Sequence, residues 1–114
     1  ITVRNEGKSL FFVWTMQGND TITGIEILSD KIIINNGVHV GMTLRDFLKK
    51  YPKSKIAVDE LTLDYEYIHV PGLDYRVDFL TTDSTRVAEF DYSTTEPTFI
   101  SIIRPKTKIS RISI

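Results

Sequence analysis

The chain has one segment with helical periodicity, and this segment is only two turns long. Its apolar stripe follows the spacing i, i+3, i+4, i+7 and consists of Leu44, Phe47, Leu48 and Tyr51. Thr43 stands just before the stripe, where its hydroxyl can cap a helix, and Pro52 stands where the helix has to end. So short a helix is marginal in isolation, so it must pack against the rest of the chain. We predict this helix over about residues 43–51.

Most of the remaining sequence has the residue pattern of β-strands. Alternation is clearest where the apolar residues Leu73, Tyr75, Val77 and Phe79 are separated by polar ones. The predicted strands cover residues 9–16, 21–28, 32–34, 61–69, 73–79, 87–92, 99–103 and 109–114. We therefore predict an α+β fold, in which a mainly antiparallel β-sheet of about seven strands carries the short helix on one face.

Length and charge limit the domain organisation and the partners. The 114 residues fit one domain, so we assign residues 1–114 to it. The formal net charge is −1, which offers no field to attract nucleic acid. No apolar run approaches the ~18 residues of a membrane span, so we predict no transmembrane segment. The first residue is Ile1, from which we expect an earlier natural start, with a removed signal or lipoprotein segment or a larger protein as the explanations.

The residue types that usually carry catalysis occur here without the spacing that catalysis needs. The chain has no cysteine, which removes thiol nucleophiles and zinc–thiolate sites. His39 and His69 are the two histidines, and neither belongs to a metal-binding motif. Asp64 and Glu66 fall on the predicted outer face of a strand, where Arg76 of the next strand can pair with one of them. We predict no catalytic residue, no metal site and no cofactor, and we favour a protein that is not an enzyme.

Aromatic residues are the strongest candidates for a binding site. Tyr65, Tyr67 and Tyr75 share the phase that we predict to face the helix. Several tyrosines on one small face suit an aromatic surface for a protein or a glycan, and the alternative is core packing with the hydroxyl groups at the rim. Trp14 and His69 complete the candidate set. The strand that contains Trp14 is apolar on both faces, which predicts either a cover on both sides or a dimer edge and leaves the oligomeric state open.

Residues 37–52 carry a family resemblance. The stretch consists of Gly37, a short β segment, Gly41-Met42-Thr43 and a short amphipathic helix that ends in Tyr51-Pro52. It resembles the entry to the helical part of small bacterial envelope proteins, namely the SmpA/OmlA lipoprotein family and the β-lactamase-inhibitor-protein-like domains. The resemblance implies an exported, non-enzymatic domain whose sheet contacts other proteins. It transfers no functional residue to this chain.

Two functional hypotheses follow from these observations. The first is an exported binding or scaffold domain of the bacterial cell envelope, periplasmic or surface-exposed, with a protein partner there and with a lipid anchor ahead of Ile1 as one form of attachment. The second is a small-ligand carrier or small enzyme with a pocket between helix and sheet, formed around Asp64, Glu66, His69 and Tyr75.

Overall fold

The computed structural model describes residues 2–15, 22–59, 64–70, 72–93 and 95–114. Over these residues the chain is mostly antiparallel β-structure with one short α-helix, which confirms the predicted α+β fold. The connection at residues 17–20, between the predicted strands 9–16 and 21–28, lies outside the described residues, and so do residues 61–63 of one predicted strand.

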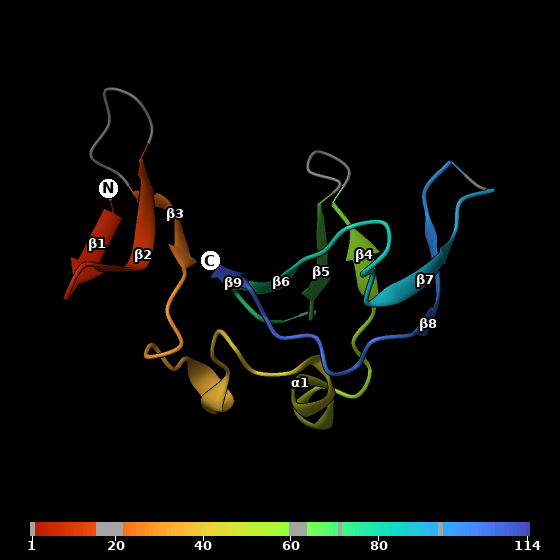
Figure 1. Cartoon of the computed structure of the whole chain (residues 1–114), viewed down its shortest axis with the longest axis horizontal. Coiled ribbons are helices and arrows are strands. Elements are labelled where there is room, and N and C mark those ends of the chain that lie inside the picture. Colours follow the sequence, from red (N-terminus) through yellow and green to blue (C-terminus); the bar gives the residue numbers. More distant parts are fainter. Residues whose placement is uncertain (1, 16–21, 60–63, 71, 94) are drawn as a thin grey trace.

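Seven strands form the main sheet. Their spatial order is β1 (Thr2–Asn5), β2 (Lys8–Thr15), β3 (Ile22–Ile27), β9 (Arg111–Ser113), β6 (Arg76–Leu80), β5 (Tyr65–His69) and β4 (Ile56–Val58). A separate hairpin consists of β7 (Ala88–Asp91) and β8 (Thr98–Ile102). Figure 1 shows the C-terminal strand β9 in the middle of the sheet, with β1 to β3 at one end and the hairpin beyond β4 at the other.

One face of the sheet, which we call the inner face, carries the core. Residues that lie directly opposite each other in antiparallel strands project to the same face. One such row crosses the sheet through Phe11, Ile27, Ile112, Val77, Ile68 and Ile56. The last five of these side chains are at most 4% exposed. They belong to one core cluster with Leu44, Phe47, Phe90 and Ile109, so the helix, the hairpin and the C-terminal segment all cover the inner face.

The helix α1 (Leu44–Lys50) begins as the sequence predicts. Thr43 Oγ1 accepts a hydrogen bond of 3.2 Å from the backbone N–H of Asp46, which satisfies one of the free donors of the first turn. Leu44 and Phe47 are buried and hold the helix against the core. The backbone N–H of Leu44 also donates to the carbonyl of Thr107 at 2.8 Å. The helix is therefore fixed both by its apolar stripe and by the C-terminal segment that passes its first turn (Figure 1).

Glu66 lies on the inner face, and the prediction that it lies on the outer face is wrong. Its side chain is fully buried. The carboxylate accepts hydrogen bonds from Thr81 Oγ1 at 2.8 Å and from the backbone N–H groups of Val87 at 2.9 Å and Ala88 at 3.1 Å. These donors replace water, which is what allows a carboxylate to occupy a core position. Glu66 thereby ties the start of β7 to the sheet, whereas Asp64 is exposed as predicted.

Two of the short strands were not predicted. β1 has four residues and β4 has three, and neither stretch shows the alternation of polar and apolar residues that indicates a strand. Residues 32–34 do not form a strand, because Ile33 makes only an isolated bridge to His39. A 3-10 turn, η1 (Asn35–Gly37), lies between these two residues, and within it Asn36 and Gly37 take the positive φ angles of 63° and 76° that favour these residue types.

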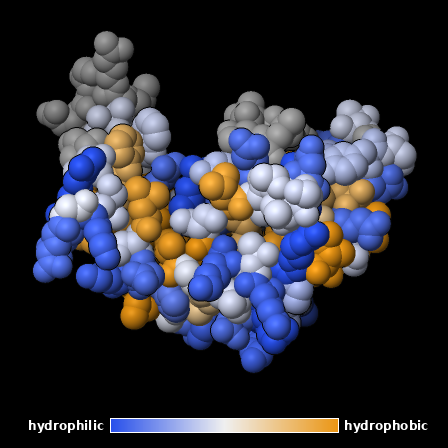
Figure 2. Space-filling view, in the orientation of Figure 1, coloured by the Kyte–Doolittle hydropathy of each residue, from blue (hydrophilic) through white to orange (hydrophobic). Residues whose placement is uncertain are grey.

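The face of the molecule seen in Figure 2 is largely polar. Figure 2 shows apolar side chains gathered over β2 and β3 and again towards the hairpin end of the molecule. Within the described ranges, no helix has the length and apolar character that crossing a membrane requires.

Candidate functional site

The opposite side of the sheet, which we call the outer face, carries aromatic and charged side chains. One row across it consists of Phe12, Glu26, Ser113, Arg76 and His69. The neighbouring row consists of Arg111, Asp78, Tyr67 and Ala57. Trp14 follows Phe12 on the same face, and the centroids of the two rings lie 4.8 Å apart. Tyr65 lies opposite Leu80. The outer face is thus one continuous surface from β2 to β4.

Asp78 is the centre of an ion-pair network on the outer face. It is fully buried, although it projects to the side without the apolar core. Its Oδ2 accepts hydrogen bonds from Arg111 Nε and from Ser113 Oγ, both at 2.8 Å. Its Oδ1 lies 2.8 Å from Arg76 Nε, in an ion pair whose angle is outside hydrogen-bond geometry. Two guanidinium groups therefore compensate one carboxylate that water does not reach.

The network extends towards both ends of the sheet. Arg76 Nη2 donates to Asp59 Oδ2 at 2.8 Å, next to the edge strand β4. Arg111 Nη1 lies 3.5 Å from Glu26 Oε1 on β3. Each arginine therefore bridges two carboxylates, and together they join strands that are not neighbours in the sequence. Such multiple pairing fixes the arginine side chains far better than a single exposed ion pair would.

Two tyrosine rings cover the two guanidinium groups. Arg111 Cζ lies 3.9 Å from the centroid of the Tyr65 ring, and Arg76 Cζ lies 4.4 Å from the centroid of the Tyr67 ring. Both distances are well inside the range of cation–π contacts. The rings shield the ion pairs from water, and the ion pairs hold the rings in place. We call this group of Tyr65, Tyr67, Arg76, Asp78 and Arg111 the arginine–tyrosine layer.

The ion pairs control the protonation of Arg111. Partial burial of the guanidinium would by itself lower its pKa. The hydrogen bond and ion pair with Asp78 and the further charge of Glu26 act in the opposite direction and outweigh burial, so the pKa of Arg111 is raised above its ordinary value. Arg111 thus keeps its charge, so it anchors the network and is no candidate for a proton donor or acceptor.

A hollow opens on the outer face at the β4 end of the arginine–tyrosine layer. Its volume is about 350 Å³, and it is lined by Ala57, Val58, Asp59, Tyr67, Arg76, Glu96 and Pro97. The segment before β8 forms one wall, and β4 to β6 form the floor. The hollow is therefore a polar depression in the face, floored by residues that the ion-pair network already holds in position.

Four of the five predicted site residues are brought to one face, but for Tyr65 and Tyr67 it is not the predicted face. Tyr65, Tyr67, His69 and Trp14 all lie on the outer face, whereas the prediction placed the tyrosines of this strand towards the helix. The reason is that Glu66 and Ile68 take the inner positions of β5, Glu66 with its hydrogen bonds satisfied. The amphipathic tyrosine rings then cover arginines instead of filling the core.

Tyr75 is separated from the other candidates. It is 8% exposed and belongs to the core cluster, on the same phase of the chain as Val77. Its hydroxyl makes no hydrogen bond of standard geometry within the described part of the chain. Burial, together with the neighbouring Tyr51 phenol, raises the pKa of Tyr75 above its ordinary value, so it stays neutral at physiological pH. Tyr75 fits the core-packing alternative.

The pocket expected around Asp64, Glu66, His69 and Tyr75 does not form as predicted. Glu66 and Tyr75 are buried on the inner face, whereas His69 is exposed on the outer face opposite Arg76. No group of three or more metal-ligating side chains occurs in the described ranges. This arrangement brings no nucleophile and base together among these four residues, but the outer face offers aromatic rings, guanidinium groups and carboxylates for contact with another molecule.

The sequence prediction missed most of the arginine–tyrosine layer. Arg76 was expected to pair with Asp64 or Glu66, and this is wrong, because its partners are Asp59 and Asp78. A signal was present in β6, where Arg76 and Asp78 stand two positions apart and therefore on one face. Nothing local indicated Arg111, because its position beside Asp78 depends on the pairing of β9 with β6.

The chain was also compared with known proteins. No family model matches it, and neither curated proteins nor solved structures include a significant match.

Proposed function

We propose that this chain is a non-enzymatic binding domain that contacts a protein partner through the outer face of its sheet. The observation that carries the proposal is the arginine–tyrosine layer, a rigid aromatic and charged surface on the side of the sheet opposite the core. The helix, the hairpin and the C-terminal segment contribute their buried side chains to the inner face. The outer face thus remains the broad surface of the sheet available to a partner.

The residue types on the outer face support protein binding. Tryptophan, tyrosine and arginine are the side chains that most often dominate the energy of protein interfaces. The outer face combines Trp14 with Tyr65, Tyr67, Arg76 and Arg111. Two large apolar side chains on it are strongly exposed, Trp14 at 50% and Leu80 at 59%. Such anchors beside fixed polar groups are typical of a recognition surface.

Pre-organisation supports the same proposal. A side chain that is already held in its bound conformation loses little entropy when a partner arrives. Arg76 has two carboxylate partners and a tyrosine ring, each within 4.4 Å. The hollow beside it gives this rigid surface a shape into which a protruding side chain can fit.

The location in the cell envelope is part of the proposal and rests on the resemblance of residues 37–52. An exported domain, periplasmic or surface-exposed, would meet its protein partner there.

The alternative, a small-ligand carrier with a pocket between helix and sheet, is favoured by a separate observation, a hollow at the C-terminal end of α1.

Replacing Leu80 by arginine tests the proposed surface. Leu80 lies at the exposed end of β6 opposite Tyr65, so the substitution adds charge and bulk to the outer face without disturbing the core. We expect Leu80→Arg to reduce partner recovery from envelope extracts by at least about tenfold, as the loss of an interface anchor does. Recovery is measured by quantitative mass spectrometry on the immobilised domain.

The matched control is Ile33→Arg. Ile33 is 67% exposed and lies outside the strands of the sheet, so it presents an equally accessible apolar side chain elsewhere. Both variants should unfold in urea at the wild-type midpoint. If Leu80→Arg and Ile33→Arg recover the same proteins in the same amounts as the wild type, the outer face is not the binding surface.

A further inference from the structure

A second hollow is formed by the last residue of α1, the four residues that follow it, and Val70 directly after β5. Its volume is about 520 Å³, and it is lined by Lys50, Tyr51, Pro52, Lys53, Ser54 and Val70. Small-molecule sites usually have volumes of about 300–1,000 Å³ and mainly apolar walls with a few polar groups. This hollow matches that description, and none of its lining residues belongs to the arginine–tyrosine layer.

The walls of this hollow are mainly apolar. Tyr51, Pro52 and Val70 contribute a ring, a pyrrolidine and a branched side chain. Ser54 does not add a free donor, because its hydroxyl donates to the carbonyl of Tyr51 at 2.7 Å. The hollow therefore suits the apolar body of a ligand better than a sugar or another strongly hydrated molecule.

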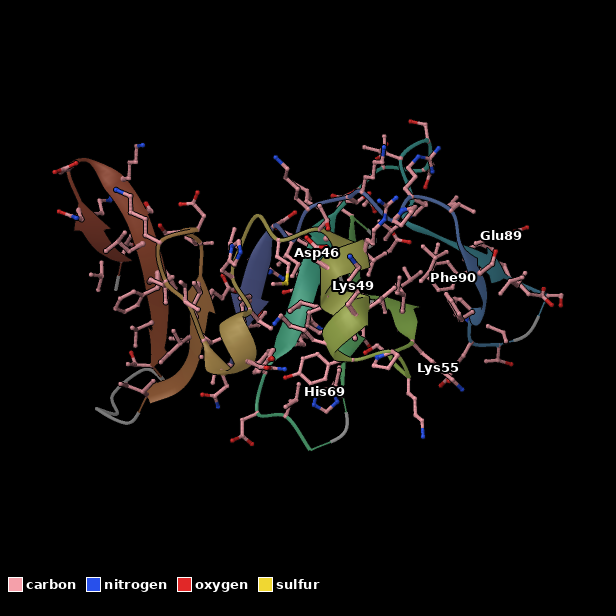
Figure 3. The ribbon with its side chains drawn as sticks, turned by 90° about the horizontal axis from the view of Figure 1, so that it is seen from below. Asp46, Lys49, Lys55, His69, Glu89 and Phe90 are labelled. Carbon is pink, nitrogen blue, oxygen red and sulfur yellow. The ribbon has the colours of Figure 1, made fainter. Side chains whose placement is uncertain are left out.

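The charged groups among the described residues of the hollow are all positive. Lys50 and Lys53 line it, and none of its described lining residues is acidic. Within the described ranges neither ammonium group has an ion-pair partner, whereas Lys49 lies 3.8 Å from Asp46 (Figure 3). Lys55 adds a further positive charge in the same stretch of chain, which contains no acidic residue between positions 49 and 55.

The lysines at the end of α1 can also be explained by the helix dipole, and the size of the charges shows how far that explanation reaches. Cations are favoured at a helix C-terminus, where the free carbonyls carry the equivalent of about half a negative charge. Two lysines at the hollow exceed that charge several-fold. A positive surplus therefore remains after the helix end is compensated, and it is available to a ligand.

We propose that this hollow binds a small organic anion with an apolar body, of the aromatic carboxylate class. The aromatic body would pack against Tyr51, Pro52 and Val70, and the carboxylate would lie at the rim within reach of Lys50 and Lys53. This site is independent of the protein-binding surface proposed above, because it uses different residues and different chemistry.

The test compares 2-naphthoate with neutral 2-naphthamide, which has nearly the same shape. Binding is followed by the chemical-shift changes of backbone amides in the ¹⁵N-labelled domain. We expect saturable naphthoate binding with shifts centred on Tyr51, Ser54 and Val70, and naphthamide binding weaker by about fivefold because an ion pair near the surface is lost. Lys50→Gln with Lys53→Gln should reduce naphthoate affinity to that of naphthamide and leave naphthamide affinity unchanged.

Two further variants control this comparison. Lys106→Gln with Lys108→Gln removes two exposed lysines elsewhere and should leave both affinities unchanged. Val70→Trp fills the hollow and should abolish binding of both probes, and the lysine variants decide the matter if Val70→Trp does not fold. The proposal is overturned if naphthoate shows no saturable binding at millimolar concentration, if the shifts centre elsewhere, or if the Lys50/Lys53 variant binds naphthoate as tightly as the wild type.

Discussion

At the scale of single residues, two carboxylates among the described residues of the sheet are fully buried, and they are compensated in different ways. Asp78 on the outer face is neutralised by two guanidinium groups and a serine hydroxyl. Glu66 on the inner face is held by one threonine hydroxyl and two backbone N–H groups, with no cation among these partners. Removing either carboxylate leaves its donors without partners, which costs more free energy than an exposed hydrogen bond is worth.

Glu66→Ala should lower the free energy of unfolding by about 3 kcal/mol, because the N–H groups of Val87 and Ala88 lose their acceptor in a buried site. Glu66→Gln should cost less than half of that. One amide oxygen can still accept from Thr81 and Val87, so only the donor of Ala88 loses its partner. Urea unfolding followed by circular dichroism measures both losses.

Glu89→Ala is the control for this pair, because Glu89 is exposed on the same hairpin and should change stability by no more than about 0.5 kcal/mol. A Glu66→Ala variant as stable as Glu89→Ala would show that the buried carboxylate does not anchor β7.

The main wrong predictions from the sequence concerned individual side chains, namely which residues of β5 are buried. In the run from Tyr65 to His69 both phases contain large residues, so alternation does not say which phase is buried. Glu66 looks like a surface residue until its donors are known, and those donors come from residues 81–88, a segment far away in the sequence. In contrast, Thr43 was identified correctly, because a helix cap depends only on neighbours in the chain.

At the scale of elements, residue periodicity predicted those helices and strands whose formation depends on interactions within the segment itself. The helix and the longer strands were found at nearly their observed positions, because their patterns span enough residues to show a period. β4 was missed, since its sequence Ile-Ala-Val shows no alternation of polar and apolar residues, and its place is set by pairing with β5. Residues 32–34 have strand-like composition but no strand partner along their length, so a single bridge forms instead.

Thr43→Ala should lower the free energy of unfolding by about 1 kcal/mol, because the first turn of α1 loses the acceptor for the Asp46 N–H. Thr43→Ser keeps a capping hydroxyl and should recover most of the loss. Thermal or urea unfolding distinguishes the two variants. Equal losses for alanine and serine would mean that Thr43 stabilises the fold through its methyl group and not as a cap.

At the scale of the whole molecule, the sheet divides the chain into two surfaces with different chemistry. The inner row from Phe11 to Ile56 is apolar and covered, and the outer rows are aromatic and charged. That a two-faced antiparallel sheet would form was predictable from alternation. Which residues meet across it was not, because β9 enters between β3 and β6 and brings Arg111 beside Asp78. The candidate site therefore depends on the order of the strands in the sheet, which places residues from distant parts of the sequence side by side.

The most direct test of the outer face as the binding surface is site-specific photocrosslinking in cells that express the protein from its natural gene. A photoreactive amino acid replaces Leu80 or His69 on the outer face, or Ile33 or Ile100 elsewhere, all of them exposed positions. We predict that Leu80 and His69 crosslink to the same partner protein and that Ile33 and Ile100 do not. Crosslinks to that partner from Ile33 or Ile100, with none from Leu80 and His69, would contradict the account.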